Sequence, residues 1–508
     1  MLSSPAIDRT GKARQPRLLL DLSTSLAWQG RHAVGIVRTE REIAVRLLES
    51  PELHVIPVVY RDHSLRVLEP EFARSLVAPV PAAAEPAAAE PGEPRRDAAF
   101  DDSGPSAGHR MADPGGNRAW LARLIRPVAA FCRLIARRLV TAGPQRSREE
   151  LRLSLIYARQ AVRHLIYRHA APVPPPPPVS PPVVTASAPA PDLGLVVHPQ
   201  RTDVLFLGGL GWDVIDWRRL SLLREATGLR IVSVMYDLIP IKFPEFLGAS
   251  SDYYLNYFIH MIDNCDKILC ISRCTQLDLA EFIDDNRRPA LPTEIIYLGA
   301  NVPAAPDAAE ITDPAVRERL RRGRFALAVG TFEIRKNYPL LIDLWEELLP
   351  DPAFDLDLVI VGMPGWCVDE AIARLQGLPA FGTRVFWFKR LSDAGLSWLY
   401  GHCLVSLFPS LYEGWGLPVV EALQHGRPVI ASSRGATPEA GFGVATILDP
   451  EDRTAWRAAL LAASQGPRQV VEIEPGRLPD WDGTALAVQR GILDMMQIPA
   501  MQTGAPCA

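Results

Sequence analysis

The sequence predicts an α/β protein built from two doubly wound, Rossmann-like domains. Two observations support this fold class. Short apolar runs typical of buried parallel strands alternate with stretches of helical spacing in the first part of the chain. A second series of the same kind starts at about residue 324, after a linker. The chain has 508 residues, 48% of them hydrophobic and 22% charged, which is globular composition and enough length for two or more domains.

Charge and cysteine usage narrow the functional classes. The formal net charge of -4 gives no general reason to expect nucleic-acid binding. Seven cysteines are scattered without paired spacing, which suits a reducing compartment. The first 16 residues have no apolar core of the kind a signal peptide needs, and no apolar run is long enough to cross a bilayer. We therefore expect a cytoplasmic protein.

The first domain is predicted from residues 17–69 and 199–300. Residues 17–22 read as a buried strand, and Gly35 opens a helical stretch that runs to Leu48. A second strand is expected at residues 53–60. The pattern then resumes, with strands at 204–207, 230–235, 267–271 and 294–298, and helices at 217–226, 253–263 and 275–282.

An Ala/Pro-rich insertion, residues 70–198, interrupts this domain. Most of it cannot bury enough apolar surface to order itself, and its poly-Pro run is expected to be extended. Residues 117–171 differ, because apolar residues recur there at helical spacing among 12 arginines and two glutamates, a balance of 12 - 2 = +10. Such basic amphipathic helices can lie on an anionic membrane surface, so that the enzyme would be peripheral on its inner face. A helical hairpin packed on its own domain fits the pattern equally well.

The second domain, residues 324–480, follows a linker at 301–323. A final helix is expected at 481–497. The strands of this domain are predicted near 325–330, 356–361, 384–388, 404–408 and 428–431.

A strand, a Gly-containing turn and a helix follow one another between Cys403 and Ser433. Gly414 and Gly416 let the backbone approach a ligand, and the N–H groups at the helix start favour an anion. Glu413 and Glu421 flank this turn. Carboxylates would repel a bare phosphate but accept hydrogen bonds from sugar hydroxyls. A nucleotide sugar combines phosphates with hydroxyls and suits both features.

The two glutamates enclosing GWGLPVV resemble the E-x7-E motif of retaining glycosyltransferases of family 4 (glycosyl transferases group 1). The resemblance implies the GT-B architecture, in which two Rossmann-like domains face a cleft, and a final helix that crosses back onto the first domain. It implies that Glu421 binds the ribose of the donor and Glu413 the sugar hydroxyls. Four further residues are implied to bind the donor: Gly414, Trp415, Gly416 and Leu417.

Three other segments resemble loops of the same family. Residues 329–337, VGTFEIRKN, match a mannosyltransferase-like motif in which Arg335 and Lys336 neutralise the departing diphosphate. We expect the Lys336 side chain to be exposed in the cleft. Residues 236–245 resemble an HDLIP loop, with Tyr236 in place of the histidine and Asp237 retained. Residues 35–40, GIVRTE, resemble a loop that faces the cleft, although Gly35 would serve a plain turn equally.

No metal and no cofactor are predicted. Asp355 and Asp357 spell a D-x-D, but they precede a strand, whereas ligand loops follow strands. We interpret them as strand-edge acids. Cys265, Cys270 and Cys274 have no familiar zinc spacing and are expected to be buried as small apolar side chains.

The function predicted from these residues is transfer of a hexose to a glycan or lipid-linked acceptor, with retention of configuration. The donor would be a nucleotide-diphosphate sugar, with mannose and hence GDP-mannose favoured. The predicted catalytic residues are Glu413, Arg335, Lys336 and Asp237. Two alternatives stay open: a GT-B sugar-nucleotide epimerase, which needs no acceptor, and a non-catalytic scaffold that kept the fold.

Overall fold

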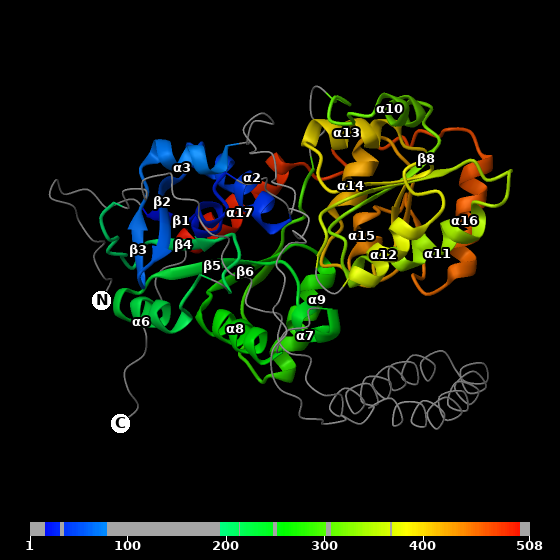
Figure 1. Cartoon of the computed structure of the whole chain (residues 1–508). Coiled ribbons are helices and arrows are strands. Elements are labelled where there is room, and N and C mark those ends of the chain that lie inside the picture. The colour runs from blue at the N-terminus through cyan, green and yellow to red at the C-terminus, as the bar shows by residue number, and fades with distance from the viewer. Residues whose placement is uncertain are drawn as a thin grey trace, which may run out of the picture. The chain divides into compact units, whose positions relative to one another are not determined.

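The structure is a computed structural model of the whole chain (Figure 1). It describes residues 16–30, 35–78, 194–212, 214–246, 251–300, 306–365 and 368–497. Within these residues two sheets form, and the described residues of both belong to one compact unit. The predicted fold class, two doubly wound sheets in an α/β chain, is confirmed. The predicted basic helices at 117–171 and residues 301–305 of the predicted linker lie outside the described residues.

The first sheet has seven strands in the order β3-β2-β1-β4-β5-β6-β7. All neighbours are parallel except β2 and β3, which pair antiparallel. The chain leaves β1 toward β2 and later returns to β4 on the other side of β1. The loops that follow β1 and β4 therefore meet at a topological switch point, where doubly wound folds bind their ligands. The strands are β1 Arg17–Asp21, β2 His54–Arg61, β3 Ser64–Val67, β4 Val204–Leu207, β5 Arg230–Met235, β6 Lys267–Cys270 and β7 Thr293–Ile295.

The second sheet has six parallel strands in the order β10-β9-β8-β11-β12-β13. Its switch point lies between β8 and β11, so the loops after these two strands are neighbours. The central strands β8, β9 and β11 are almost entirely buried, mostly apolar runs, as expected where helices cover both faces of a sheet. The strands of this sheet are β8 Phe325–Val329, β9 Asp357–Val361, β10 Val385–Phe388, β11 Val405–Phe408, β12 Val429–Ser432 and β13 Thr446–Leu448.

Helices cover the sheets in the alternating order that parallel strands require. Helix α9 is capped by Ser272, whose hydroxyl accepts from the Thr275 amide. The helices that accompany the first sheet are α1 Ser23–Ala27, α2 Ile36–Leu48, α3 Pro70–Val77, α6 Trp217–Thr227, α7 Ile239–Lys242, η2 Pro244–Phe246, α8 Ser251–Asn264 and α9 Arg273–Asp285. The helices that accompany the second sheet are α10 Pro314–Arg321, η3 Ile334–Lys336, α11 Tyr338–Leu348, α12 Asp369–Gly377, α13 Asp393–His402, α14 Leu417–Gln424, α15 Thr437–Ala440 and α16 Arg453–Gln465.

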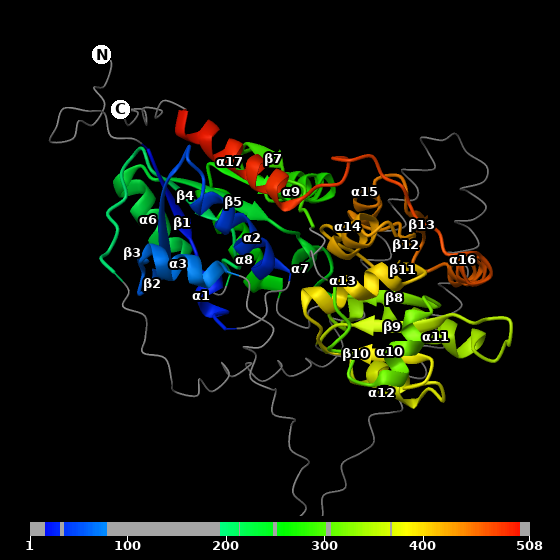
Figure 2. The same ribbon diagram turned by 90° about the horizontal axis from the view of Figure 1, so that it is seen from above.

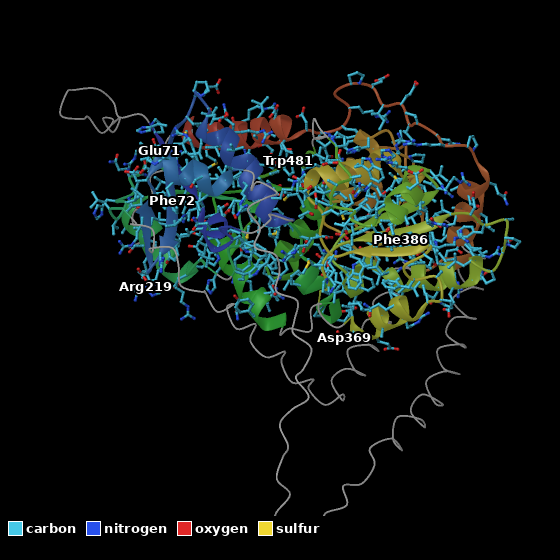
Figure 3. All side chains as sticks on the ribbon, turned by 45° about the horizontal axis from the view of Figure 1, so that its top comes forward. Glu71, Phe72, Arg219, Asp369, Phe386 and Trp481 are labelled. Atoms are coloured by element: carbon cyan, nitrogen blue, oxygen red, sulfur yellow. The ribbon has the colours of Figure 1, made fainter. Side chains whose placement is uncertain are left out.

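The last described helix, α17 (Trp481–Gln497), packs on the first sheet although it follows the second in sequence. It lies beside α2 and contacts β4 and β6 (Figure 2). Arg46 on α2 donates to Asp482 at 2.5 Å, and the Thr484 hydroxyl donates to the Tyr297 carbonyl. Trp481, labelled in Figure 3 where α17 begins, is 1% exposed. The buried face of this helix therefore fastens the end of the chain to the first domain.

Two elements near the insertion differ from the sequence expectation. Strand β3 and helix α3 follow β2 directly, and Ala73, Leu76 and Val77 are buried in the core of the first domain. On the other side of the insertion, the Gly194 amide donates to the Val67 carbonyl at 3.1 Å. The first domain thus includes residues to about 77 and from 194, whereas the insertion was expected to span 70–198. A short amphipathic helix inside an Ala/Pro-rich context gave too little periodicity to separate it from the insertion.

Candidate functional site

The loops after β8 and β11 bring together the cationic and acidic residues predicted from the second domain. Arg335 and Lys336 lie in η3, just after β8, and Glu413 lies in the turn after β11. Lys336 Nζ donates to Glu413 Oε1 at 2.6 Å, and Arg335 Nη1 donates to Glu413 Oε2. Arg335 also contacts Glu333 Oε1 at 2.7 Å. One carboxylate is therefore held between two cations at the switch point of the sheet.

Burial decides how these charges behave. Lys336 is 9% exposed and its Nζ lies 4.7 Å from the centre of the Phe408 ring, so the expectation of an exposed lysine is wrong. Burial lowers the pKa of Lys336, against the pull of Glu413. Burial works against the charge of Glu413 as well, but Arg335 and Lys336 outweigh it and lower its pKa. The carboxylate is thus held ionised at neutral pH, with its two cations beside it.

The turn that carries Gly414 touches the first domain. A Cβ on Gly414 would lie 2.3 Å from the Tyr236 carbonyl oxygen and 2.7 Å from Asp237 Cβ, so no larger residue fits without moving backbone. The Thr275 hydroxyl donates to the Gly414 carbonyl at 3.2 Å. The loops after β5 and β11 therefore meet at this glycine.

The three residues after Gly414 have different surroundings. Trp415 is 3% exposed; its indole N–H donates to the Leu298 carbonyl at 3.0 Å, and its ring stacks on Tyr297 with centroids 5.1 Å apart. Its side chain thus joins the two domains. Gly416 caps α14 and Leu417 is its first residue, with Pro418 in the second position. A proline there costs no hydrogen bond, because the first turn has no intrahelical acceptor for its N–H.

Glu421, in the second turn of α14, is contacted from both sides. Its Oε2 accepts from the Tyr400 hydroxyl and its Oε1 from Arg38 Nη1, each at 2.9 Å. Arg38 comes from α2 of the first domain. Gly35, which begins that helix at φ +54°, lies one turn earlier, and its carbonyl accepts from the Thr39 amide at 3.1 Å.

Asp237 follows β5 and completes the predicted set. Its Oδ1 accepts from the Ile239 amide at 3.0 Å. Burial raises its pKa to about 6, while Arg335 opposes the shift. Tyr236 stands where the family resemblance places a histidine, and its hydroxyl donates to the Gly208 carbonyl at 2.5 Å. The tyrosine side chain is thus a buried brace between the loops after β4 and β5.

A pocket opens beside Asp237 at the switch point of the first sheet. Its wall is largely aromatic and apolar, and its lining includes Gly209, Trp212, Tyr236, Asp237, Tyr257 and Met261. Trp212 and Tyr257 meet edge to face with centroids 5.9 Å apart. Aromatic faces with a nearby carboxyl are a common surrounding for polar, ring-shaped ligands.

Behind Gly209 lie two buried carboxyls that the sequence analysis did not select. Glu40 is 2% exposed, and its Oε2 accepts from the Ser25 amide at 2.6 Å. Burial and the neighbouring Asp21 raise the pKa of Glu40 to about 8. Burial raises the pKa of Asp21 to about 6. A Cβ on Gly209, which lines the pocket, would lie 2.2 Å from Glu40 Oε1, so this carboxyl lies directly against the glycine.

Arg38, Glu40 and Tyr400 are the functional candidates that the sequence analysis missed. Arg38 and Glu40 both lie in the GIVRTE segment that resembled a cleft-facing loop. On a helix with apolar residues at regular spacing, charged residues usually mark the solvated face. Arg38 and Glu40 could have been identified as site residues by their position, because they lie in the first turns of a helix that directly follows a strand at the switch point.

The D-x-D residues and the cysteines have ordinary structural surroundings. Asp357 accepts from Arg319 Nε at 2.5 Å and from Arg384 Nε at 3.1 Å, and Asp355 pairs with Arg324. Cys265 and Cys270 are buried as expected, whereas Cys274 is only partly buried. Among the residues that the structure describes, no group of three or more His, Cys, Asp or Glu side chains is placed to hold a metal ion. No helix in that same part of the chain is long and apolar enough to cross a membrane.

Comparison with known proteins agrees with this geometry. Residues 323–465 match the family model "Glycosyl transferases group 1". The serotype-specific mannosyltransferase WbdA of Escherichia coli is 29% identical over 215 residues, which cover 41% of this chain and 26% of WbdA. O-antigen chain mannosyltransferase B of the same species is 28% identical over 240 residues, covering 46% of this chain and 61% of that one.

Among solved structures, a sucrose-phosphate synthase from Thermosynechococcus elongatus aligns with a TM-score of 0.44 and 21% identity, over 58% of this chain and 73% of that one. This chain spans about a quarter of the length of WbdA. The match to the family model covers the whole loop cluster from Arg335 to Glu421. Residues 323–465 of the second domain are therefore similar to the glycosyl transferases group 1 domain.

Proposed function

We propose that this protein is a hexosyltransferase that moves a sugar, mannose favoured, from a nucleotide-diphosphate donor to a glycan or lipid-linked acceptor. The observation that carries the proposal is Glu413 held between Arg335 and Lys336, beside the Gly-containing turn that opens α14. Anionic ligands and sugar hydroxyls have complementary partners there.

The donor's two halves would use different parts of this cluster. The diphosphate needs positive charge and amide donors, which Arg335, Lys336 and the start of α14 supply. The sugar needs hydrogen-bond acceptors for its hydroxyls, which Glu413 supplies. The ribose hydroxyls would use Glu421, whose two carboxylate oxygens accept hydrogen bonds.

The acceptor would lie near Asp237, against the aromatic residues at the mouth of this small pocket. Its aromatic wall, with Trp212 and Tyr257, suits the apolar face of a pyranose ring, and Asp237 can accept from a hydroxyl. Retention is supported only by the family resemblance. We favour same-face attack, in which the acceptor oxygen bonds to the anomeric carbon as the C–O bond to the diphosphate breaks. The departing phosphate takes the acceptor's proton, so no protein nucleophile is needed.

The decisive experiment is a donor screen with the full chain. GDP-, UDP- and ADP-linked mannose and glucose are each tested for thermal stabilisation and for release of the nucleoside diphosphate. A ligand that binds only the folded state raises its melting temperature, and the true donor should do so at micromolar to millimolar concentration. Absence of both effects with all six donors would refute the proposed donor class.

Two alternatives give different products in the same screen. An epimerase would convert the donor without an acceptor and without consuming a second sugar. A scaffold would bind the nucleotide, or nothing, and turn over neither. Release of nucleoside diphosphate that depends on added mannose oligosaccharide would favour the transferase over both.

For the setting of the reaction we propose the cytoplasmic side of a membrane, with residues 117–171 as the contact to an anionic surface. The support is the +10 balance of that segment in the sequence, to which each arginine near anionic lipid would add about 1 kcal/mol. Wild-type protein should sediment with anionic vesicles at low salt and be released as salt rises. Equal sedimentation by a variant lacking residues 117–171 would assign the segment to another partner.

A further inference from the structure

Arg38 reaches from the first domain to the carboxylate that the proposed function gives to the ribose. Its Nη1 donates to Glu421 Oε1 at 2.9 Å, and the two side chains are 19% and 11% exposed. The Tyr400 hydroxyl occupies the other oxygen, Oε2. Both oxygens of Glu421 therefore already have protein partners.

A ribose and Arg38 compete for the same oxygen. The 2′ and 3′ hydroxyls of a ribose are donors, as is a guanidinium, and Tyr400 comes from the same domain as Glu421. Arg38 is the partner that the first domain supplies, so it is the one whose departure leaves the second domain's own packing unchanged. Two adjacent hydroxyls can replace one guanidinium on a carboxylate without leaving it unpaired.

The displaced guanidinium would remain charged. A guanidinium stays protonated in proteins whichever acceptor it faces, so leaving Glu421 does not neutralise Arg38. Its Nε is buried and has no hydrogen-bond partner among the described residues. In a nucleotide, a single 5′ CH2–O group joins the ribose ring to its first phosphorus. An arginine pushed off the ribose carboxylate therefore has an anion within reach, and a planar fork that can bind it through two donors.

We propose, on the basis of the proposed function, that Arg38 is a donor-binding residue that exchanges Glu421 for the diphosphate when a nucleotide sugar binds. Without ligand it holds α2 against α14 through Glu421. With ligand, the ribose takes Glu421 and Arg38 contacts a phosphate oxygen. Each domain then contacts the same donor, so donor binding is coupled to contact between the domains.

The test compares ligands with and without phosphates on the full-length Arg38→Gln protein. Dissociation constants are measured for GDP, UDP and ADP and for the matching nucleosides, the weaker ligands by competition. The diphosphate should bind about tenfold more weakly to the variant, as expected for loss of one charge-assisted hydrogen bond. The nucleoside should bind as well as to the wild type or up to about threefold more tightly, because its competitor for Glu421 is gone. Arg38→Lys should fall between the two.

Arg46→Gln is the matched control, because Arg46 lies on the same helix and also pairs with a distant carboxylate, Asp482. Arg46→Gln should change neither the diphosphate nor the nucleoside dissociation constant relative to the wild type. Equal weakening of nucleoside and diphosphate in Arg38→Gln, or a diphosphate constant within twofold of wild type, would overturn the exchange. Failure of the wild type to bind any of the three diphosphates would instead refute the proposed function and this inference with it. Thermal unfolding of each variant shows whether a loss of binding comes from misfolding. If Arg38→Gln misfolds, the ratio of the diphosphate to the nucleoside dissociation constant in Arg38→Lys decides.

Discussion

The carboxyls at the two switch points are held in opposite ways. In the second domain, Glu413 sits between two cations that lower its pKa. In the first, burial raises the pKa of Glu40 to about 8 and that of Asp21 to about 6, with serine and threonine hydroxyls as partners in place of cations. The same fold thus presents an ion-paired carboxylate on one side and, on the other, a buried Glu40 carboxyl that is largely protonated at neutral pH. This contrast fits an anionic donor facing a neutral sugar acceptor.

The largest expected effect concerns Glu40 and the pH dependence of stability. Its folded pKa of about 8 lies above the unfolded value of about 4.3, so the folded state binds more protons between these limits. Its contribution to stability is present at low pH and is lost as pH rises through 8. Glu40→Gln should remove this loss. The free energy of unfolding of the variant minus that of the wild type should therefore increase by on the order of 4 kcal/mol from pH 5 to pH 9.

Urea unfolding followed across pH 5 to 9 measures this difference. The control is Glu42→Gln. Glu42 lies two residues further along the same helix and its side chain is partly exposed, so this substitution should leave the pH dependence of stability unchanged. Parallel profiles for wild type and Glu40→Gln would mean that Glu40 is ionised at neutral pH, and the contrast between the two domains would disappear.

The second effect tests the charged side of the comparison. Lys336→Met keeps the length and burial of the side chain but removes its charge. Turnover should fall by roughly two orders of magnitude, as when one donor that stabilises a leaving group is lost. Glu413 keeps Arg335 as a partner, so the protein should still fold.

Turnover is measured with the donor found in the screen, at saturating concentration. Lys389→Met serves as the control, since Lys389 lies over the Trp387 ring away from the cluster and should retain wild-type turnover. A Lys336→Met enzyme with turnover within a factor of three of wild type would remove Lys336 from the catalytic set.

The third effect compares one glycine from each side. A Cβ at position 414 would meet the carbonyl oxygen of Tyr236, which is backbone and cannot move alone, whereas at 209 it would meet the side chains of Glu40 and Thr24. Gly414→Ala should therefore destabilise by about 1–3 kcal/mol and Gly209→Ala by less.

Gly401→Ala, with open space around it in α13, should be neutral or slightly stabilising. Melting temperatures of the three variants give the order. If Gly209→Ala proved the more damaging, the loops after β5 and β11 would be less tightly joined than the contact at Gly414 implies.

The sheets and the second-domain site could be predicted from sequence because their signals are local. Buried strands are short apolar runs, and Glu413, Gly414 and Glu421 lie within nine residues of one another. The partners of these residues could not be predicted in the same way. Arg38 and Glu421 are 383 residues apart, and only the docking of α2 against α14 brings them together.

Burial was the other property that sequence reasoning estimated poorly. A lysine after a strand reads as solvated, yet Phe408 and Gly330 cover Lys336. The family resemblance assigns Trp415 to donor binding, whereas its indole N–H donates to the Leu298 carbonyl and its ring stacks on Tyr297. Whether a polar or aromatic side chain is covered depends on a second element, which the local pattern does not contain.

The smallest expected effect is that of removing divalent metal ions. The two aspartates that spell a metal-binding motif are neutralised by arginines: Asp357 by Arg319 and Arg384, and Asp355 by Arg324. Asp357 also begins β9, at the opposite end of the strand from the ligand loops. Under the proposed function Arg335 and Lys336 supply the positive charge for the diphosphate, so activity should be unchanged within a factor of two in EDTA. Loss of activity in EDTA that Mn²⁺ restores, and that Asp355→Asn abolishes, would place a metal where the structure has ion pairs.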